Sequence, residues 1–153
     1  MVELESASPE ETERIAAAVA RELAPGDVVT VAGELGAGKT TFVRGAARAL
    51  GIEGHVTSPT YTVGHRYAGD PDVCHLDLYR FEGMSEPDWG DLEGYFEDAV
   101  VFVEWPEAGA RFLPPARVEA RLRHLGAGHR LILLGSPEKA LENRLSTGAG
   151  PRV

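Results

Sequence analysis

The chain has 153 residues, of which 43% are hydrophobic and 25% charged, and its formal net charge is -9. These values fit one globular domain, and the negative charge argues against unaided binding to nucleic-acid phosphates. The single cysteine, Cys74, excludes an internal disulfide and a cysteine metal cluster. No apolar run approaches membrane-spanning length and the N-terminus lacks a leader pattern, so the sequence predicts a cytoplasmic protein.

The first predicted elements are a short strand and a helix. Residues 2–5 alternate between apolar and acidic side chains, as a strand does. A helix start follows, with Ser8 as N-cap, Pro9 at the first helical position and Glu11 closing a capping box. Apolar residues at helical spacing extend this predicted helix to about Leu23.

A glycine-rich segment, Gly33 to Thr40, lies between a β-branched stretch at 27–32 and a helical one at 41–50. It reads Gly-Glu-Leu-Gly-Ala-Gly-Lys-Thr and fits the phosphate-binding pattern G-x-x-x-x-G-K-[ST] in full. Glycines let successive N–H groups converge on an anion, and the helix start adds positive potential. Lys39 offers a compact charge to the outer phosphates, and the Thr40 hydroxyl is a ligand for Mg²⁺.

The middle of the chain predicts a hairpin and a helix. Residues 51–59 form a loop, and the hydroxyl-rich turn Ser58-Pro59-Thr60-Tyr61-Thr62 overlaps its end. Residues 61–67 and 73–79 predict two antiparallel strands joined by a turn at 69–72. We expect 80–89 to be irregular and 91–96 to be a short helix.

The last third predicts a buried strand at 100–103, a proline-rich connection, and a hairpin of 117–124 with 130–134. Ser136-Pro137-Glu138 starts a last short helix, and 146–153 has the composition of a disordered tail, so the domain spans 1–145. The predicted fold class is α/β, a P-loop NTPase-like single domain with a mixed parallel/antiparallel central sheet flanked by helices. The phosphate loop lies at the carboxyl end of its strand.

Two acids complete the predicted site. Glu104 follows four apolar strand residues, which is the Walker-B arrangement for a carboxylate that holds Mg²⁺. Asp77 lies in an apolar strand, where it either forms an ion pair with Arg80 or serves Mg²⁺ or the attacking water. His75 shares the face of Asp77, and we expect it to be a packed histidine rather than a catalytic one.

The nucleotide is predicted from absent motifs. The chain contains no glutamine to orient water as in Ras-type GTPases, and its only asparagine, Asn143, does not begin the guanine-reading motif N-K-x-D. The sequence therefore favours ATP.

Four segments together resemble one family: 33–41, 58–62, the sequence His-Leu-Asp-Leu-Tyr-Arg at 75–80, and Val-Glu-Trp-Pro at 103–106. They are similar to TsaE (YjeE), the small P-loop ATPases required for threonylcarbamoyladenosine synthesis on bacterial tRNA, over about residues 8 to 135. The family acts with TsaD and TsaB, so the resemblance implies TsaD-like and TsaB-like partners, with tRNA reached only through them.

The resemblance also implies a role for each matching residue. It makes Lys39, Asp77 and Glu104 catalytic, and it assigns Mg²⁺ to Thr40 and Glu104. Ser58, Thr60 and Trp105 belong to a surface that responds to nucleotide or partners. ATP contacts are implied for Leu35, Gly36, Ala37, Gly38, Lys39, Thr40 and Thr41, for Ser8, Pro9 and Thr12 near the adenine, and for Arg130.

Two other functions remain open from the residues. A small P-loop metabolite kinase shares the loop and the size, but it needs lid arginines, for which Arg80 and Arg111 are the candidates. A nucleotide-binding scaffold that does not hydrolyse ATP is the third hypothesis.

Overall fold

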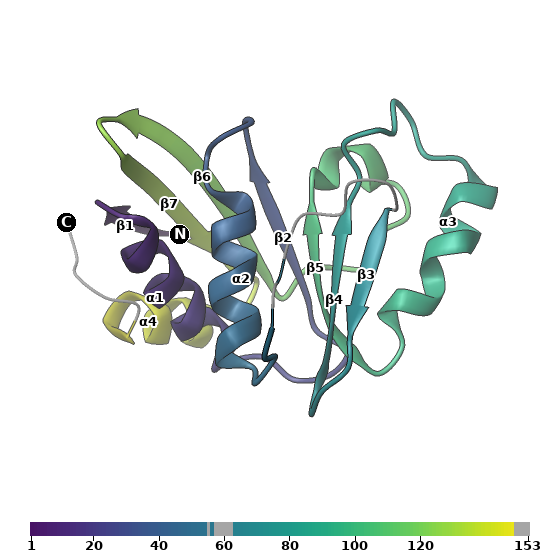
Figure 1. Cartoon of the computed structure of the whole chain (residues 1–153), viewed down its shortest axis with the longest axis horizontal. Helices are drawn as coiled ribbons and strands as arrows, with labels where there is room; N and C mark the ends of the chain where they lie inside the picture. The colour runs from purple at the N-terminus through teal and green to yellow at the C-terminus, as the bar shows by residue number, and fades with distance from the viewer. Residues whose placement is uncertain (55, 57–62, 149–153) are drawn as a thin grey trace.

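The computed structural model describes residues 1–54, 56 and 63–148 of the chain. Its centre is a seven-stranded sheet in the order β1-β7-β6-β2-β5-β4-β3 (Figure 1). The strands are β1 (Val2–Ser6), β2 (Val28–Gly33), β3 (Gly64–Tyr67), β4 (Asp72–Asp77), β5 (Ala99–Glu104), β6 (Val118–Gly126) and β7 (His129–Gly135). The helices are α1 (Pro9–Ala20), α2 (Lys39–Ala49), α3 (Glu86–Leu92) and α4 (Lys139–Gly148), with 3₁₀ turns η1 (Glu93–Phe96) and η2 (Pro106–Gly109).

The sheet is mixed, which confirms the predicted fold class. β6, β2, β5 and β4 run parallel to their neighbours in the middle of the sheet. The edges are antiparallel, because β7 pairs with both β6 and β1 and β3 pairs with β4. Both predicted hairpins are therefore confirmed. Since parallel strands end at the same edge, β2, β4 and β5 deliver their last residues to one place.

Two apolar cores lie on opposite faces of this sheet. All six residues of β5 are buried, with Val100 and Phe102 in the core under α1, α2 and α4, and Val101 and Val103 in the other core. α3 and the segments around η1 and η2 cover that second face (Figure 1). A parallel strand buried on both faces carries a continuous apolar run, which is why 100–103 was recognisable from the sequence.

The start of α1 agrees with the prediction except in the partner of Glu11. The Ser8 hydroxyl caps the helix by accepting the Glu11 N–H at 3.1 Å. The Glu11 carboxylate, however, accepts the N–H of Ala7 at 2.9 Å, one residue before the position that a capping box uses. The helix ends at Ala20 rather than near Leu23, because the backbone tightens there into i→i−3 hydrogen bonds.

The prediction for residues 80–96 was right in part: 91–96 is helical, but 86–89 is not irregular. α3 begins at Glu86, within the stretch expected to be irregular, and ends at Leu92, where η1 takes over. Its signal was present in the sequence: Ser85 and Asp88 form a complete capping box around Pro87. This is the same pattern that was recognised at Ser8.

Other boundaries differ by a few residues. β4 ends at Asp77 instead of Tyr79, since its partner β5 ends opposite at Glu104. α4 reaches Gly148, so 146–148 are helical and not the start of a disordered tail, with Leu145 buried against the core. The predicted turn at 58–62, the first two residues of the predicted strand 61–67 and the tail from 149 lie outside the described residues. None of the helices in the described ranges is long and apolar enough to cross a membrane.

Candidate functional site

The glycine loop connects the end of β2 to the start of α2. Gly33 has φ +152, and a Cβ there would lie 2.6 Å from the Leu122 carbonyl oxygen of the neighbouring strand β6. Gly38, the N-cap of α2, has φ +100, which is in the left-handed region that side chains disfavour. Only glycine therefore fits both the close approach to β6 and the turn into the helix. Backbone geometry therefore explains why glycine stands at these two positions of the loop.

Lys39, the first residue of α2, is held by the loop itself. Its ammonium group donates to the carbonyl oxygens of Gly33 at 2.6 Å and Glu34 at 2.8 Å, and only 5% of the residue is exposed. The same nitrogen lies 4.3 Å from the centre of the Trp105 ring, a cation–π distance. Burial lowers the pKa of Lys39, while the charges of Glu104 and Asp77 act in the opposite direction. The lysine is thus a buried cation whose hydrogen-bond partners are two neutral backbone carbonyl groups.

Glu104, the last residue of β5, faces the start of α2. Its Oε2 accepts the Thr40 hydroxyl at 3.3 Å, across 64 positions of sequence, and lies 2.5 Å from Nε2 of His75. Glu104 is 3% exposed and His75 is completely buried. The carboxylate is therefore held from two elements, with the phosphate-loop threonine on one side.

Asp77 is directly beside Glu104, because the two residues pair in the parallel register of β4 and β5. Its Oδ1 accepts the N–H of Tyr79 at 3.0 Å. The Tyr79 ring packs on that of Trp105, with centroids 4.8 Å apart. Trp105 has φ +55, an uncommon conformation for a bulky residue. The turn after β5 thereby places an aromatic pair at the rim of the two carboxylates.

Arg130 approaches the loop from β7, and its Nε donates to the carbonyl oxygen of Ala37 at 3.0 Å. Between this arginine, the loop and the two acids lies a cavity of about 360 Å³. The structure thus gathers nine of the residues predicted to be catalytic or to bind ATP or Mg²⁺, together with Trp105. The cavity is lined by Leu35, Gly36, Gly38, Lys39, Thr40, Thr41, Asp77, Tyr79, Glu104, Trp105 and Arg130.

Four predicted binding residues do not line this cavity. Ala37 belongs to the loop, but its side chain is fully buried, and its carbonyl oxygen accepts a hydrogen bond from Arg130. Ser8, Pro9 and Thr12 lie at the start of α1, where the Thr12 hydroxyl is 2.7 Å from that of Ser6. This helix start neighbours the site through the sheet, because Ser6 pairs with Arg130 between β1 and β7. The predicted contact with adenine stays a prediction.

Sequence reasoning missed two features of the site. His75 was predicted to be a packed histidine, and it is buried, but it also contacts Glu104. Its spacing from Asp77 on one strand face was the available signal. Tyr79 was treated only as a strand residue, although more than half of it is exposed beside Trp105. No local pattern distinguishes such a rim residue from an ordinary strand end.

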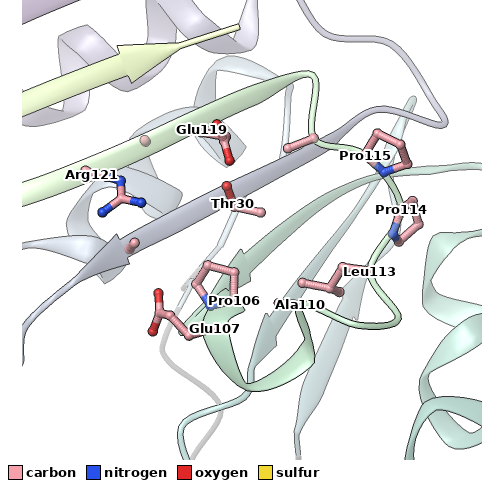
Figure 2. Close-up of a pocket in the computed structure, with 12 residues that line it drawn as sticks. Thr30, Pro106, Glu107, Ala110, Leu113, Pro114, Pro115, Glu119 and Arg121 are labelled. Carbon is pink, nitrogen blue, oxygen red and sulfur yellow. The ribbon is translucent and has the colours of Figure 1, made fainter. Parts of the chain in front are cut away.

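A second cavity of about 360 Å³ lies on the face of the sheet that is turned away from α1 and α2 (Figure 2). Thr30 and Glu119, which pair between β2 and β6, point into it together with Arg121. The opposite wall is formed by Pro106, Glu107 and the segment around Leu113. None of the binding or catalytic residues predicted from the sequence lines this second cavity.

The fold and the loop together define a class: a single-domain α/β protein of the P-loop NTPase type, with a Walker-B-like acid beside the loop. The family model for "Threonylcarbamoyl adenosine biosynthesis protein TsaE" matches residues 6–132. The chain belongs to the TsaE family of tRNA threonylcarbamoyladenosine biosynthesis proteins.

Individual relatives agree with this assignment. The chain is 42% identical to the TsaE protein of Bacillus subtilis over 126 residues, covering 82% of this chain and 79% of that one. It is 40% identical to TsaE of Treponema pallidum, with 83% and 95% covered. A crystal structure of Bacillus subtilis YdiB superposes with a TM-score of 0.80 at 33% identity, covering 97% of this chain and 96% of YdiB.

Proposed function

We propose that this chain is a Mg²⁺-dependent ATPase that acts on a TsaD-like and TsaB-like partner complex in tRNA threonylcarbamoyladenosine synthesis. The observation that carries the proposal is the 3.3 Å distance between Thr40 Oγ1 and Glu104 Oε2. Two oxygens bound to adjacent positions of one octahedral Mg²⁺ lie about 3 Å apart. The donor set of hydroxyl and carboxylate oxygens is the one that Mg²⁺ prefers, so the residues fit the ion.

Lys39 would bind the outer phosphates of ATP. To do so, its ammonium group exchanges the carbonyl oxygens of Gly33 and Glu34 for phosphate oxygens. This exchange is favourable, because a buried cation gains an anionic partner in place of neutral ones. The loop N–H groups and the start of α2 add further positive potential. Bound Mg²⁺ would neutralise charge on the phosphate oxygens, held by Thr40 and Glu104.

Asp77 is the acid available to orient the attacking water. It ends β4 beside Glu104 and lines the same cavity. A carboxylate there accepts a hydrogen bond from a water molecule and aligns one lone pair of that water with the phosphorus. Since the chain contains no glutamine, an acid takes the place of the residue that Ras-type enzymes use.

The kinase alternative receives less support from the geometry. Its lid requires arginines at the phosphates, and neither Arg80 nor Arg111 lines the cavity. Arg111 instead packs over the ring of Phe112 at 5.2 Å. Arg130 is the arginine that borders the loop, and it comes from a sheet strand rather than from a lid. We therefore propose water as the acceptor, and a cytoplasmic location where tRNA is reached through the partners.

The test combines hydrolysis with tRNA modification in cells. Lys39→Ala and Glu104→Ala should each abolish partner-stimulated ATP hydrolysis and the modified nucleoside together, while Glu119→Ala, an exposed acid on the other sheet face, should leave both intact. A pull-down with and without ATP should recover TsaD-like and TsaB-like proteins. Normal modification in cells that carry Lys39→Ala would refute the proposal, and ATP-dependent phosphorylation of a metabolite would favour the kinase.

A further inference from the structure

We propose that His75 is a positioning residue for the metal site: its Nε2–H holds one oxygen of Glu104 and so orients that carboxylate. This inference rests on the proposed function, since it assigns the orientation of a carboxylate that would hold Mg²⁺. His75 lies inside β4, is completely buried, and has Nε2 2.5 Å from Glu104 Oε2.

The His75 ring is the donor in this pair. A carboxylate only accepts, so the hydrogen belongs to Nε2. Nδ1 is buried without a partner among the described residues. The ring therefore directs its Nε2–H at Glu104.

The same oxygen of Glu104 also accepts the Thr40 hydroxyl. Two donors, His75 from β4 and Thr40 from α2, thus fix the rotation of one carboxyl group. With Oε2 held, the direction of the other oxygen is set as well. In metal sites, hydrogen-bond partners of this kind orient the ligands, and removing one weakens metal affinity about 10- to 100-fold. His75 would keep Glu104 ready for Mg²⁺ before nucleotide binds.

A purely structural role makes a different prediction. If His75 only fills space in the sheet, any side chain that fills it should serve equally well. Two substitutions separate the roles. His75→Gln places its amide nitrogen where Nε2 is, whereas His75→Asn is shorter and places it near Nδ1, out of reach of Glu104. His65→Gln is the matched control, because His65 pairs with His75 between β3 and β4 but contacts Tyr67 instead.

The experiment uses Mn²⁺ as the probe and measures its binding by electron paramagnetic resonance in the presence of ADP. His75→Asn should weaken Mn²⁺ binding about tenfold or more, while His75→Gln and His65→Gln stay within about threefold of the unmodified chain. ADP affinity in EDTA should be unchanged in all variants, because His75 acts only through the metal ligand. His75→Leu removes the donor altogether, so it should also weaken Mn²⁺ binding about tenfold or more.

Equal Mn²⁺ affinities for the Gln and Asn variants would overturn the proposal. If neither His75→Asn nor His75→Leu folds, His75→Gln decides: binding near the unmodified strength supports the proposal, and a tenfold loss overturns it. Failure of the unmodified chain to bind ADP at all would instead contradict the proposed function, so the two failures are distinguishable.

Discussion

Lys39 is a buried cation whose position has a cost to folding. It is buried, and burial lowers its pKa below the ordinary value of 10.5. A cation with a lowered pKa destabilises the fold at all pH values below that pKa, because the unfolded chain holds the proton more readily. The cost diminishes as pH rises from the lowered value to 10.5.

Because its pKa is lowered, Lys39 should make the stability of the fold depend on pH. The free energy of unfolding of the unmodified chain, relative to Lys39→Met, should shift in favour of the unmodified chain between about pH 7 and about pH 10. Lys139→Met is the control, because Lys139 is the other lysine of the chain and its side chain is 88% exposed. Urea denaturation at both pH values measures the difference, and an equal shift for the two lysines would contradict burial as the cause.

At the scale of elements, the position of α2 depends on its contact with α1. A Cβ on Gly45 would lie 2.5 Å from the Glu13 Cα and 2.7 Å from its carbonyl oxygen, both backbone atoms of α1. Arg48 and Glu13 form an ion pair at 2.6 Å across the same helix contact. Because α2 carries Lys39 and Thr40 at its start, this close packing also sets where the phosphate loop ends.

Gly45→Ala should therefore destabilise the protein, since the two helices must separate. Overpacking of this kind costs about 1–3 kcal/mol, against a gain of up to about 1 kcal/mol from helix propensity. Gly90→Ala in α3 is the matched control: nothing lies within 4 Å of its Cβ, and the same propensity should make it slightly stabilising. Thermal unfolding followed by circular dichroism compares them, and equal midpoints would show that α1 yields freely.

At the scale of the whole molecule, the site joins α2 to three strands of the sheet. Lys39 and Thr40 come from α2, Glu104 and Asp77 from β5 and β4, and Arg130 from β7. A ligand that bridges these elements stabilises the folded chain as a unit, because the unfolded chain has no such site.

Saturating ATP with Mg²⁺ should raise the midpoint of thermal unfolding. A ligand at about one hundred times its dissociation constant contributes about 2.7 kcal/mol, which corresponds to roughly 5–10 °C for a chain of this size. ATP in EDTA should give a smaller rise, and Glu104→Gln should reduce the effect of Mg²⁺ while Glu119→Gln retains it. Equal rises with and without Mg²⁺ would indicate that Thr40 and Glu104 do not hold the ion.

The sequence alone was sufficient where the determinant is local. The phosphate loop is recognisable because its glycines are required at φ values that other residues avoid, and β5 is recognisable by its apolar run. The capping signal at Ser8 and the turn between β6 and β7 are equally local. The capping signal at Ser85 is local as well, so the start of α3 at Glu86 could also be predicted from the sequence.

The tertiary structure alone decided which distant residues meet. The order of the strands sets β4 beside β5 and so brings His75 and Asp77 to Glu104, and the β6–β7 hairpin carries Arg130 to the loop. No periodicity encodes these contacts, because they depend on the register between strands and on the helix packing against them. A residue's type and spacing specify the chemistry it offers, while sheet topology specifies the partner to which that chemistry is applied.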